Sequence, residues 1–151
     1  MDPSVSSGPL PPPRELTSHQ PPALLVGELL AVAADSTAGR ARLLNPAGLD
    51  LLQLVEGCAQ TLAVLMGHGL RAGGGGAASG MLVGMKDVRL TRPAAAGETV
   101  EVAATLVHRL GPFRLYAVRA TAGDDELLSA ELKTVSTGGE TGEASTPEAT
   151  P

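Results

Sequence analysis

Residues 49–67 read LDLLQLVEGCAQTLAVLMG, and this stretch decides the fold class. Apolar residues occupy nearly the whole circumference that a helix over these positions would have, and a helix of that kind is usually buried. The exceptions are Gln53, Glu56 and Gln60, which fall at spacings of i, i+3 and i+7 and therefore share one face. The sequence thus predicts a long buried helix with one polar stripe.

The start of this helix has two possible positions. Asn45-Pro46 offers a capping side chain followed by a proline in the first turn. Gly48 and Asp50 offer a second, later start. The pattern leaves both open.

Strand patterns lie on both sides of the helix. Before it, the periodicity of residues 23–34 suits either a buried strand or a short helix, and we expect a turn that leads into a strand. After a further turn, residues 40–44 suit a short return strand. Four strands are expected after it, at residues 80–92, 98–110, 113–122 and 126–135. In the first of these four, Gly84 is expected to mark a bulge or a close approach. In the second, period-2 alternation places Leu106 on the buried face and Arg109 on the other. An antiparallel sheet wrapped around one buried helix is an α+β arrangement.

The two ends of the chain differ from its middle. Residues 1–17 and 136–151 are rich in Pro, Ser, Thr and Gly, and such segments bury too little apolar surface to offset the entropy of ordering. We therefore expect two disordered tails around one folded domain at residues 18–135. The tails also carry most of the formal net charge of −5, so the domain itself is nearly neutral.

Composition argues against several classes of function. The net charge is negative and Phe113 and Tyr116 are the only aromatic residues, which argues against a nucleic-acid partner. The apolar runs are far shorter than the ~18 residues of a membrane span, and no secretory signal is visible, so we expect no membrane contact and a cytoplasmic location. Cys58 is the single cysteine, and three scattered His lack metal-ligand spacing, so no metal is expected. Residues 73–76 are four glycines without the spacing of a phosphate-binding loop, and no cofactor is expected.

The polar stripe of the helix admits two interpretations. It can face solvent, or it can hold Glu56 between two amides at the mouth of an apolar pocket. Exposed helix faces normally carry both signs of charge, and this stripe has no Lys or Arg, which favours the pocket. A carboxylate held in that way suits a general acid or base.

Four segments occur in the order found in a known enzyme family. They are HQPPALLV at 19–26, VEGCAQ at 55–60, RPAAAGETV at 92–100 and LSAEL at 128–132. They resemble the opening HRxPxLLVD segment, the helical (I/V)EAxAQ motif, the RRPVxPGD turn and the closing LVAEAxL strand of the 3-hydroxyacyl-ACP dehydratases. GMLVG at 80–84 resembles a strand start of the divergent dehydratases of aryl-polyene and type II polyketide pathways. The resemblance implies a hotdog fold and the conversion of 3-hydroxyacyl-ACP to trans-2-enoyl-ACP.

The resemblance also implies roles for single residues. Glu56 is similar to the family carboxylate that acts on the leaving hydroxyl, and Gln60 to the amide that orients it. The family's catalytic His, in a GHFP segment before the helix, has no counterpart here, so His19 is the internal candidate for the base. Gly48, at a possible helix start, would offer a backbone N–H to the thioester oxygen. Three residues are expected to bind the substrate: Gly48, Gln53 and Gly84.

The absent GHFP segment leaves several functions open. Two hotdog subunits build an active site together, so the chain can act as a homodimer that uses His19 or as a heterodimer whose second subunit supplies the His. A hotdog thioesterase, which needs only a carboxylate and water, and a non-catalytic partner subunit are the alternatives. The acyl substrate would arrive on an acidic acyl carrier protein. Basic residues of the last four strands would form its docking patch: Lys86, Arg89, Arg92, Arg109, Arg114 and Arg119.

Overall fold

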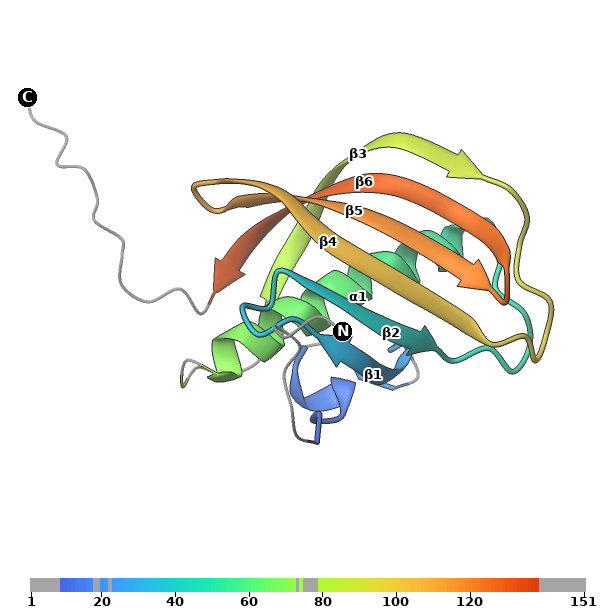
Figure 1. The fold of residues 1–151 in the computed structure, drawn as a ribbon, viewed down its shortest axis with the longest axis horizontal. Helices are drawn as coiled ribbons and strands as arrows, with labels where there is room; N and C mark the ends of the chain where they lie inside the picture. Colours follow the sequence, from blue (N-terminus) through green and yellow to red (C-terminus); the bar gives the residue numbers. More distant parts are fainter. Residues whose placement is uncertain (1–8, 18–19, 22, 73, 75–78, 139–151) are drawn as a thin grey trace, which may run out of the picture.

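A six-stranded antiparallel sheet curves over one long helix (Figure 1). The computed structural model describes residues 9–17, 20–21, 23–72, 74 and 79–138 of the 151-residue chain. The strands lie in the order β1-β2-β4-β5-β6-β3. This arrangement confirms the predicted α+β hotdog fold, with two strands, a helix and four further strands in chain order. The elements are η1 (Pro13–Glu15), β1 (Val26–Val32), β2 (Ala38–Leu43), α1 (Leu51–Ala72), β3 (Ser79–Leu90), β4 (Val100–Leu110), β5 (Phe113–Ala122) and β6 (Asp125–Gly138).

The core lies between α1 and the concave face of the sheet. The helix contributes Leu54, Leu62 and Leu65, and alternate residues of the strands oppose them, as Val100 and Val102 do in β4. All five side chains are fully buried. Burying one such side chain stabilises the fold by about 1.5–3 kcal/mol relative to leaving it exposed. The nearly uniform apolar character of α1 therefore follows from its place beneath the sheet.

The N-terminus of α1 is closed by a capping box. The Asp50 carboxylate accepts a hydrogen bond from the Gln53 backbone N–H (2.8 Å), and the Gln53 side chain accepts one from the Asp50 N–H (2.9 Å). This reciprocal pair satisfies two backbone donors that a helix start leaves without partners. The later of the two predicted starts is thus the observed one, and the helix runs on to Ala72, past its predicted end at residue 67.

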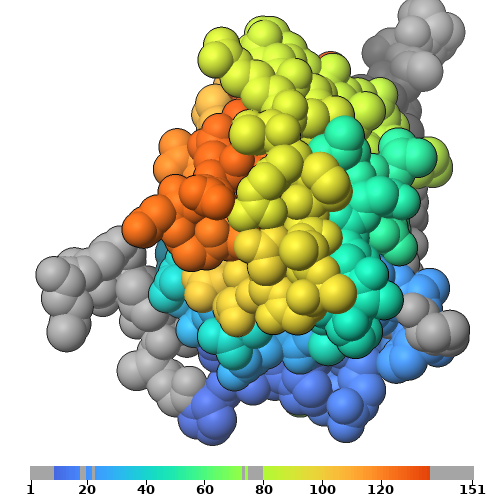
Figure 2. All heavy atoms as spheres, turned by 90° about the vertical axis from the view of Figure 1, so that its right-hand side faces the viewer, coloured from blue at the N-terminus to red at the C-terminus, as the bar shows by residue number. Residues whose placement is uncertain are grey.

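Asn45 closes the loop before the helix instead of capping it. Its Nδ2 donates hydrogen bonds to the carbonyls of Ala95 (2.7 Å) and Glu98 (3.0 Å). An antiparallel bridge between Leu49 and Ala94 fixes the same loop a few residues later. Figure 2 shows the loop before the helix, in teal, packed against the turn before β4, in yellow. The turn that resembles the RRPVxPGD motif therefore positions the start of α1.

The segment before residue 18 belongs to the folded body. Leu16 is fully buried and Pro13 of η1 is buried. Gly67 of α1 makes room for this segment, because a Cβ at that position would collide with the Leu16 carbonyl. The domain start predicted at residue 18 was therefore wrong: proline-rich composition does not reveal that a segment packs on a helix. Strand β6 likewise continues to Gly138, past the predicted end at residue 135, and the expected tails at 1–8 and 139–151 lie outside the described residues.

Two strand irregularities change which side chains face the helix. Strand β3 shifts its register on β6 at Gly84, so the bulge predicted there is confirmed. Strand β4 shifts its register on β5 between Leu106 and His108, which leaves Val107 as an extra residue. A bulge of this kind re-aims the residues that follow it. Arg109 consequently faces the same side as Leu106, and the prediction of opposite faces was wrong.

The two edges of the sheet are covered to different degrees. At one edge, β1 contacts η1 of the N-terminal segment, and a hollow lies between β1 and residues 10–13. The other edge is β3, a long strand with exposed apolar side chains, and such an edge is a site where another chain can pair. Six large apolar residues of β3 are exposed: Met81, Leu82, Val83, Met85, Val88 and Leu90.

Candidate active site

The polar stripe of α1 brings Glu56 and Gln60 together. They lie one turn apart, and the Gln60 Nε2 donates a hydrogen bond to Glu56 Oε1 (2.9 Å). Gln60 is only 1% exposed, whereas Glu56 is exposed. A buried amide thus orients an accessible carboxylate.

Gln60 also ties the segment just before β1 to the helix. Its Oε1 accepts a hydrogen bond from the Leu25 N–H (2.6 Å), and its Nε2 donates a second one to the Ala23 carbonyl (2.9 Å). The residues thereby fixed follow closely on His19 in the sequence. His19 itself lies outside the described residues, so its part as the base stays a prediction.

The single chain leaves the Glu56 carboxylate accessible. The sequence favoured a carboxylate at the mouth of an apolar pocket. In the structure the polar stripe passes from the exposed Gln53 and Glu56 to the buried Gln60, so Glu56 lies where the stripe leaves the surface. Enclosing an acyl group against this carboxylate therefore requires a further surface over it.

The three expected substrate-binding residues are not brought together. Gly48 has a φ of +92° and precedes the Asp50 cap, so its N–H is not one of the free donors of the helix N-terminus, as its proposed role required. The Gln53 side chain is engaged in the capping box. Gly84 lies on the edge strand β3, beside Lys133 of β6. The part of these three residues in substrate binding stays a prediction.

Two other reactive side chains are occupied or buried. Burial raises the pKa of the Cys58 thiol to about 12, which keeps it in its unreactive protonated form. The His68 ring contacts Ser36 of the β1–β2 turn, with 3.1 Å between Nδ1 and Oγ. Among the described residues, no group of three or more His, Cys, Asp or Glu side chains is arranged to hold a metal ion. Within the same ranges, no helix has the length and apolar character needed to cross a membrane.

The six basic residues expected to form one docking patch are divided. Arg92 and Arg119 are held in ion pairs with carboxylates of this chain, at 2.8 Å and 2.9 Å. Lys86 and Arg89 lie on the edge strand β3. Arg89 and Arg119 nevertheless line one hollow of the sheet together, and the part of the basic residues in docking a carrier protein stays a prediction. The remaining two line a pocket on the concave side of the sheet: Arg109 and Arg114.

Comparison with known sequences identifies the family of this chain. The sequence profile of the ApeP-like family, described as ApeP dehydratase, matches residues 11–144. The chain belongs to the ApeP-like dehydratase family. The resemblance to divergent dehydratases that the motifs indicated is thereby confirmed. No curated protein matches the sequence significantly.

Solved structures share the fold of this ApeP-like chain. A chain of the dehydratase heterocomplex ApeI:P from Xenorhabdus doucetiae is similar at a TM-score of 0.77 and 16% identity, over 86% of this chain and 93% of that one. A hypothetical thioesterase protein with coenzyme A from Streptococcus pneumoniae TIGR4 has a TM-score of 0.58 and 10% identity, over 74% and 85%. The PaaI protein of E. coli, from the phenylacetic acid degradation operon, has a TM-score of 0.57 and 13% identity, over 74% and 79%. At these identities the likeness establishes the hotdog fold alone.

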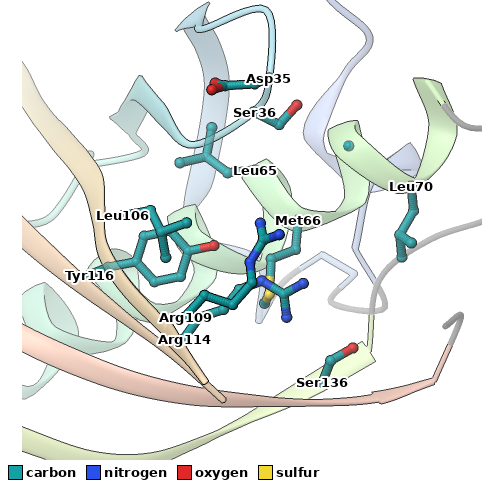
Figure 3. Close-up of a pocket in the computed structure, with 11 residues that line it drawn as sticks. Asp35, Ser36, Leu65, Met66, Leu70, Leu106, Arg109, Arg114, Tyr116 and Ser136 are labelled. Carbon is teal, nitrogen blue, oxygen red and sulfur yellow. The ribbon is translucent and has the colours of Figure 1, made fainter. Parts of the chain in front are cut away.

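The structure also reveals a pocket that sequence reasoning missed. It lies beside the C-terminal half of α1, has a volume of about 200 Å³, and is lined by both charged and apolar side chains (Figure 3). Arg109 reaches it only because of the extra residue at Val107, and period-2 alternation cannot show such a shift. We call it the arginine pocket, after Arg109 and Arg114.

Proposed function

We propose that this ApeP-like chain is one subunit of a heterodimeric dehydratase that converts 3-hydroxyacyl-ACP to trans-2-enoyl-ACP in aryl-polyene or related polyketide biosynthesis. The observation that carries the proposal is the Glu56 carboxylate, oriented by a buried Gln60, in a chain of this dehydratase family. The absence of His between Gly27 and Glu56 supports a second subunit as the source of the base. The similar ApeI:P structure is described as a heterocomplex, which favours the same arrangement here.

The proposed chemistry divides acid and base between two groups. An imidazole removes the proton on the carbon next to the thioester carbonyl, and backbone donors stabilise the developing enolate oxygen. Glu56, in its protonated form, then gives its proton to the C3 hydroxyl, which leaves as water while the C2–C3 double bond forms. The Gln60 amide holds Glu56 Oε1 throughout, so the carboxyl group stays aimed at the hydroxyl.

The proposed partner contact is the edge strand β3. The opposite edge, β1, contacts η1, whereas β3 exposes apolar side chains such as Met81 (57%) and Met85 (54%). A second hotdog subunit that pairs with β3 would continue the sheet and bury these side chains. The register shifts of β3 on β6 give the strand an irregular edge. A partner strand with a matching irregularity would therefore pair with it better than an arbitrary strand.

The proposed substrate carrier is an acidic acyl carrier protein. Lys86 and Arg89 lie on the same edge strand as the partner contact. Among the described residues, neither side chain has a carboxylate oxygen within 4.0 Å, so their charges are available to an acidic surface. Complementary charge would speed the encounter with the carrier more than it would tighten the complex.

A dehydration assay with defined subunits tests the proposal. A 3-hydroxyacyl-ACP is incubated with this chain, with a hotdog protein encoded beside it, and with both, and intact-protein mass spectrometry follows the loss of one water. We expect dehydration in the mixture only, and a rate at least about 100-fold lower with Glu56→Gln in this chain, since a general acid contributes about 10²–10⁴-fold. Leu110→Glu, on an exposed hairpin end, is the matched surface control and should not change the rate.

Other outcomes separate the alternatives. Dehydration by this chain alone that is lost in His19→Ala would favour the homodimer. Release of a free acid without an enoyl product would favour a thioesterase, whose fold the coenzyme A-bound relative shares. Full activity of the mixture with Glu56→Gln would make this chain a non-catalytic partner and overturn the role of Glu56.

A further inference from the structure

The arginine pocket lies apart from the Glu56–Gln60 pair. Its helix residues are Leu65, Met66, Gly69 and Leu70, which begin nine residues after Glu56. At a rise of about 1.5 Å per residue, the pocket starts roughly 14 Å further along α1. It is therefore a separate feature, at the opposite end of the helix from the capping box.

Two arginines on neighbouring strands meet at this pocket. Arg109 of β4 and Arg114 of β5 are direct cross-strand partners, and both line the pocket. Figure 3 shows their guanidinium groups together beneath Met66 of the helix. Like charges placed directly opposite each other on a sheet destabilise it. The sheet nevertheless places the two arginines side by side, because the extra residue at Val107 turns Arg109 toward the pocket.

Among the described residues, no carboxylate forms a direct ion pair with either arginine, since no carboxylate oxygen lies within 4.0 Å of either guanidinium group. Asp35 is the one carboxylate in the pocket lining, and its Oδ1 accepts hydrogen bonds from the backbone N–H (3.1 Å) and hydroxyl (2.6 Å) of Thr37. The pKa of the Asp35 carboxyl is lowered chiefly by these hydrogen bonds from Thr37, and to a lesser degree by the charge of Arg109. Two guanidinium groups therefore face the pocket with their donors available.

A buried hydroxyl beside the pair also lacks a partner. Thr134 of β6 is the cross-strand partner of Arg114 and is 4% exposed. Its Oγ1 has no hydrogen-bond partner among the described residues, and a buried polar atom left in this way is costly. Thr134 itself is not part of the pocket lining, which on the sheet side holds Tyr116 and Ser136 beside the two arginines. The polar side of the pocket is thus rich in donors, which suits an anionic group.

The opposite wall of the pocket is apolar. It is formed by Leu65, Met66 and Leu70 of α1 with Leu106 of β4. A pocket of about 200 Å³ is smaller than the roughly 300–1,000 Å³ of sites for drug-sized ligands. Its occupant is therefore a small molecule or a short molecular terminus, with a charged head and an apolar body.

We propose that the arginine pocket binds a small organic anion, whose carboxylate or phosphate head bridges Arg109 and Arg114 and whose short apolar body lies against Leu65, Met66 and Leu106. Arginine is suited to this role because its planar donors match the oxygens of both head groups in pairs. A free carboxylic acid and a phosphate-bearing thiol such as pantetheine 4′-phosphate share this chemistry. The proposal is independent of the dehydratase activity.

The single tyrosine of the chain offers a direct readout. Tyr116 lines the pocket, and the sequence has no other tyrosine and no tryptophan, so its fluorescence reports on this site alone. The full chain is titrated with hexanoate, with acetate, with hexanol and with pantetheine 4′-phosphate, and calorimetry is run in parallel. We expect a saturable change with hexanoate at a lower concentration than with acetate, because only hexanoate reaches the apolar wall. Hexanol should give no saturable change, and the tighter of hexanoate and pantetheine 4′-phosphate identifies the head group.

Matched variants distinguish the pocket from general charge attraction. Arg109→Gln and Arg114→Gln should each weaken hexanoate binding by about tenfold or more, as expected for loss of a charge-assisted hydrogen bond. Arg119→Gln is the control, because Arg119 lies on the same strand, is exposed and pairs with Glu126. Far-UV circular dichroism confirms that each variant folds. The proposal is overturned if no anion binds, if hexanol binds as well as hexanoate, or if Arg119→Gln weakens binding as much as the pocket variants do.

Discussion

Gln60 is the residue on which the candidate active site most depends. One buried amide group bonds the Glu56 carboxylate, the Ala23 carbonyl and the Leu25 N–H. The last of these partners lies 35 residues away in the sequence, so the side chain connects a helix turn with the entry to β1. The same contact that positions the proposed acid therefore also stabilises the fold.

Replacing Gln60 should destabilise the protein measurably. In Gln60→Ala, the part-buried backbone groups of Ala23 and Leu25 lose their partners, and each such group costs about 1–3 kcal/mol. We expect a loss of about 2 kcal/mol in the free energy of unfolding, measured by urea denaturation. Gln53→Ala removes the exposed side chain of the capping box and should cost at most about 1 kcal/mol. Equal losses in the two variants would show that Gln60 does not fix the N-terminal strand.

Glu98 should determine part of the acid sensitivity. Hydrogen bonds from Arg92, at 2.8 and 3.0 Å, and from the Ala95 N–H lower the pKa of the Glu98 carboxyl from 4.5 to about 2. Since the folded-state pKa lies below the unfolded value, this stabilisation is complete above about pH 4.5 and is lost as the pH falls toward 2. Urea midpoints between pH 2 and pH 7 should therefore depend less on pH in Glu98→Gln than in the wild type. Glu101→Gln, which breaks a single-bond surface pair with Arg40, should keep the wild-type slope; a slope equally reduced in it would contradict this assignment.

At the scale of the elements, the local sequence pattern was sufficient to predict the helix and the strands, because the contacts that form them are local. The apolar run from residue 49 identified α1, and alternation identified the strands to within a few residues. The site was harder to predict because its contacts join distant segments, as between Gln60 and Ala23 or between Asn45 and Ala95. The extra residue at Val107 shows the same limit, since it depends on how β4 meets β5 and not on the pattern within β4.

The packing of the N-terminal segment on α1 predicts an unusual effect at Gly67. Exchanging a helical glycine for alanine normally stabilises a helix by about 1 kcal/mol. At Gly67 the added Cβ would collide with the Leu16 carbonyl, so the segment must move away and expose Leu16. We expect a net loss of about 2–4 kcal/mol, comparable with truncating a buried leucine, as measured by thermal or urea unfolding.

A neighbouring glycine provides the control for this change. A Cβ at Gly69 meets only the Ser36 side chain, at 3.3 Å, which can shift slightly. Gly69→Ala should therefore alter the stability by less than about 1 kcal/mol. If Gly67→Ala stabilised the protein instead, residues before 18 would contribute no packing to the fold.

For the molecule as a whole, the two sheet edges differ in their exposure. The N-terminal segment with η1 contacts β1, whereas β3 is the open edge. The exposed Glu56 and the exposed apolar side chains of β3 are both features of the single chain that a partner subunit would change. The fold is thus complete on its own, whereas the proposed catalytic site is not.

Assembly through β3 should be sensitive to charge on that strand. Met85 is 54% exposed, so Met85→Glu should leave the folding of this chain intact while placing a carboxylate in the proposed interface. We expect its affinity for the second hotdog subunit, measured by calorimetry or native mass spectrometry, to fall at least about tenfold, because a buried unpaired charge costs well over 1.4 kcal/mol. Leu110→Glu makes the same exchange at a side chain that is 69% exposed on the β4–β5 hairpin, and the affinity should stay at the wild-type value.

Dehydration by the mixture should fall in parallel with the affinity in Met85→Glu and recover at high subunit concentration, since the substitution affects assembly and leaves Glu56 in place. Unchanged affinity in Met85→Glu would move the partner away from β3, while failure to recover at high concentration would indicate that β3 also contributes to the catalytic site.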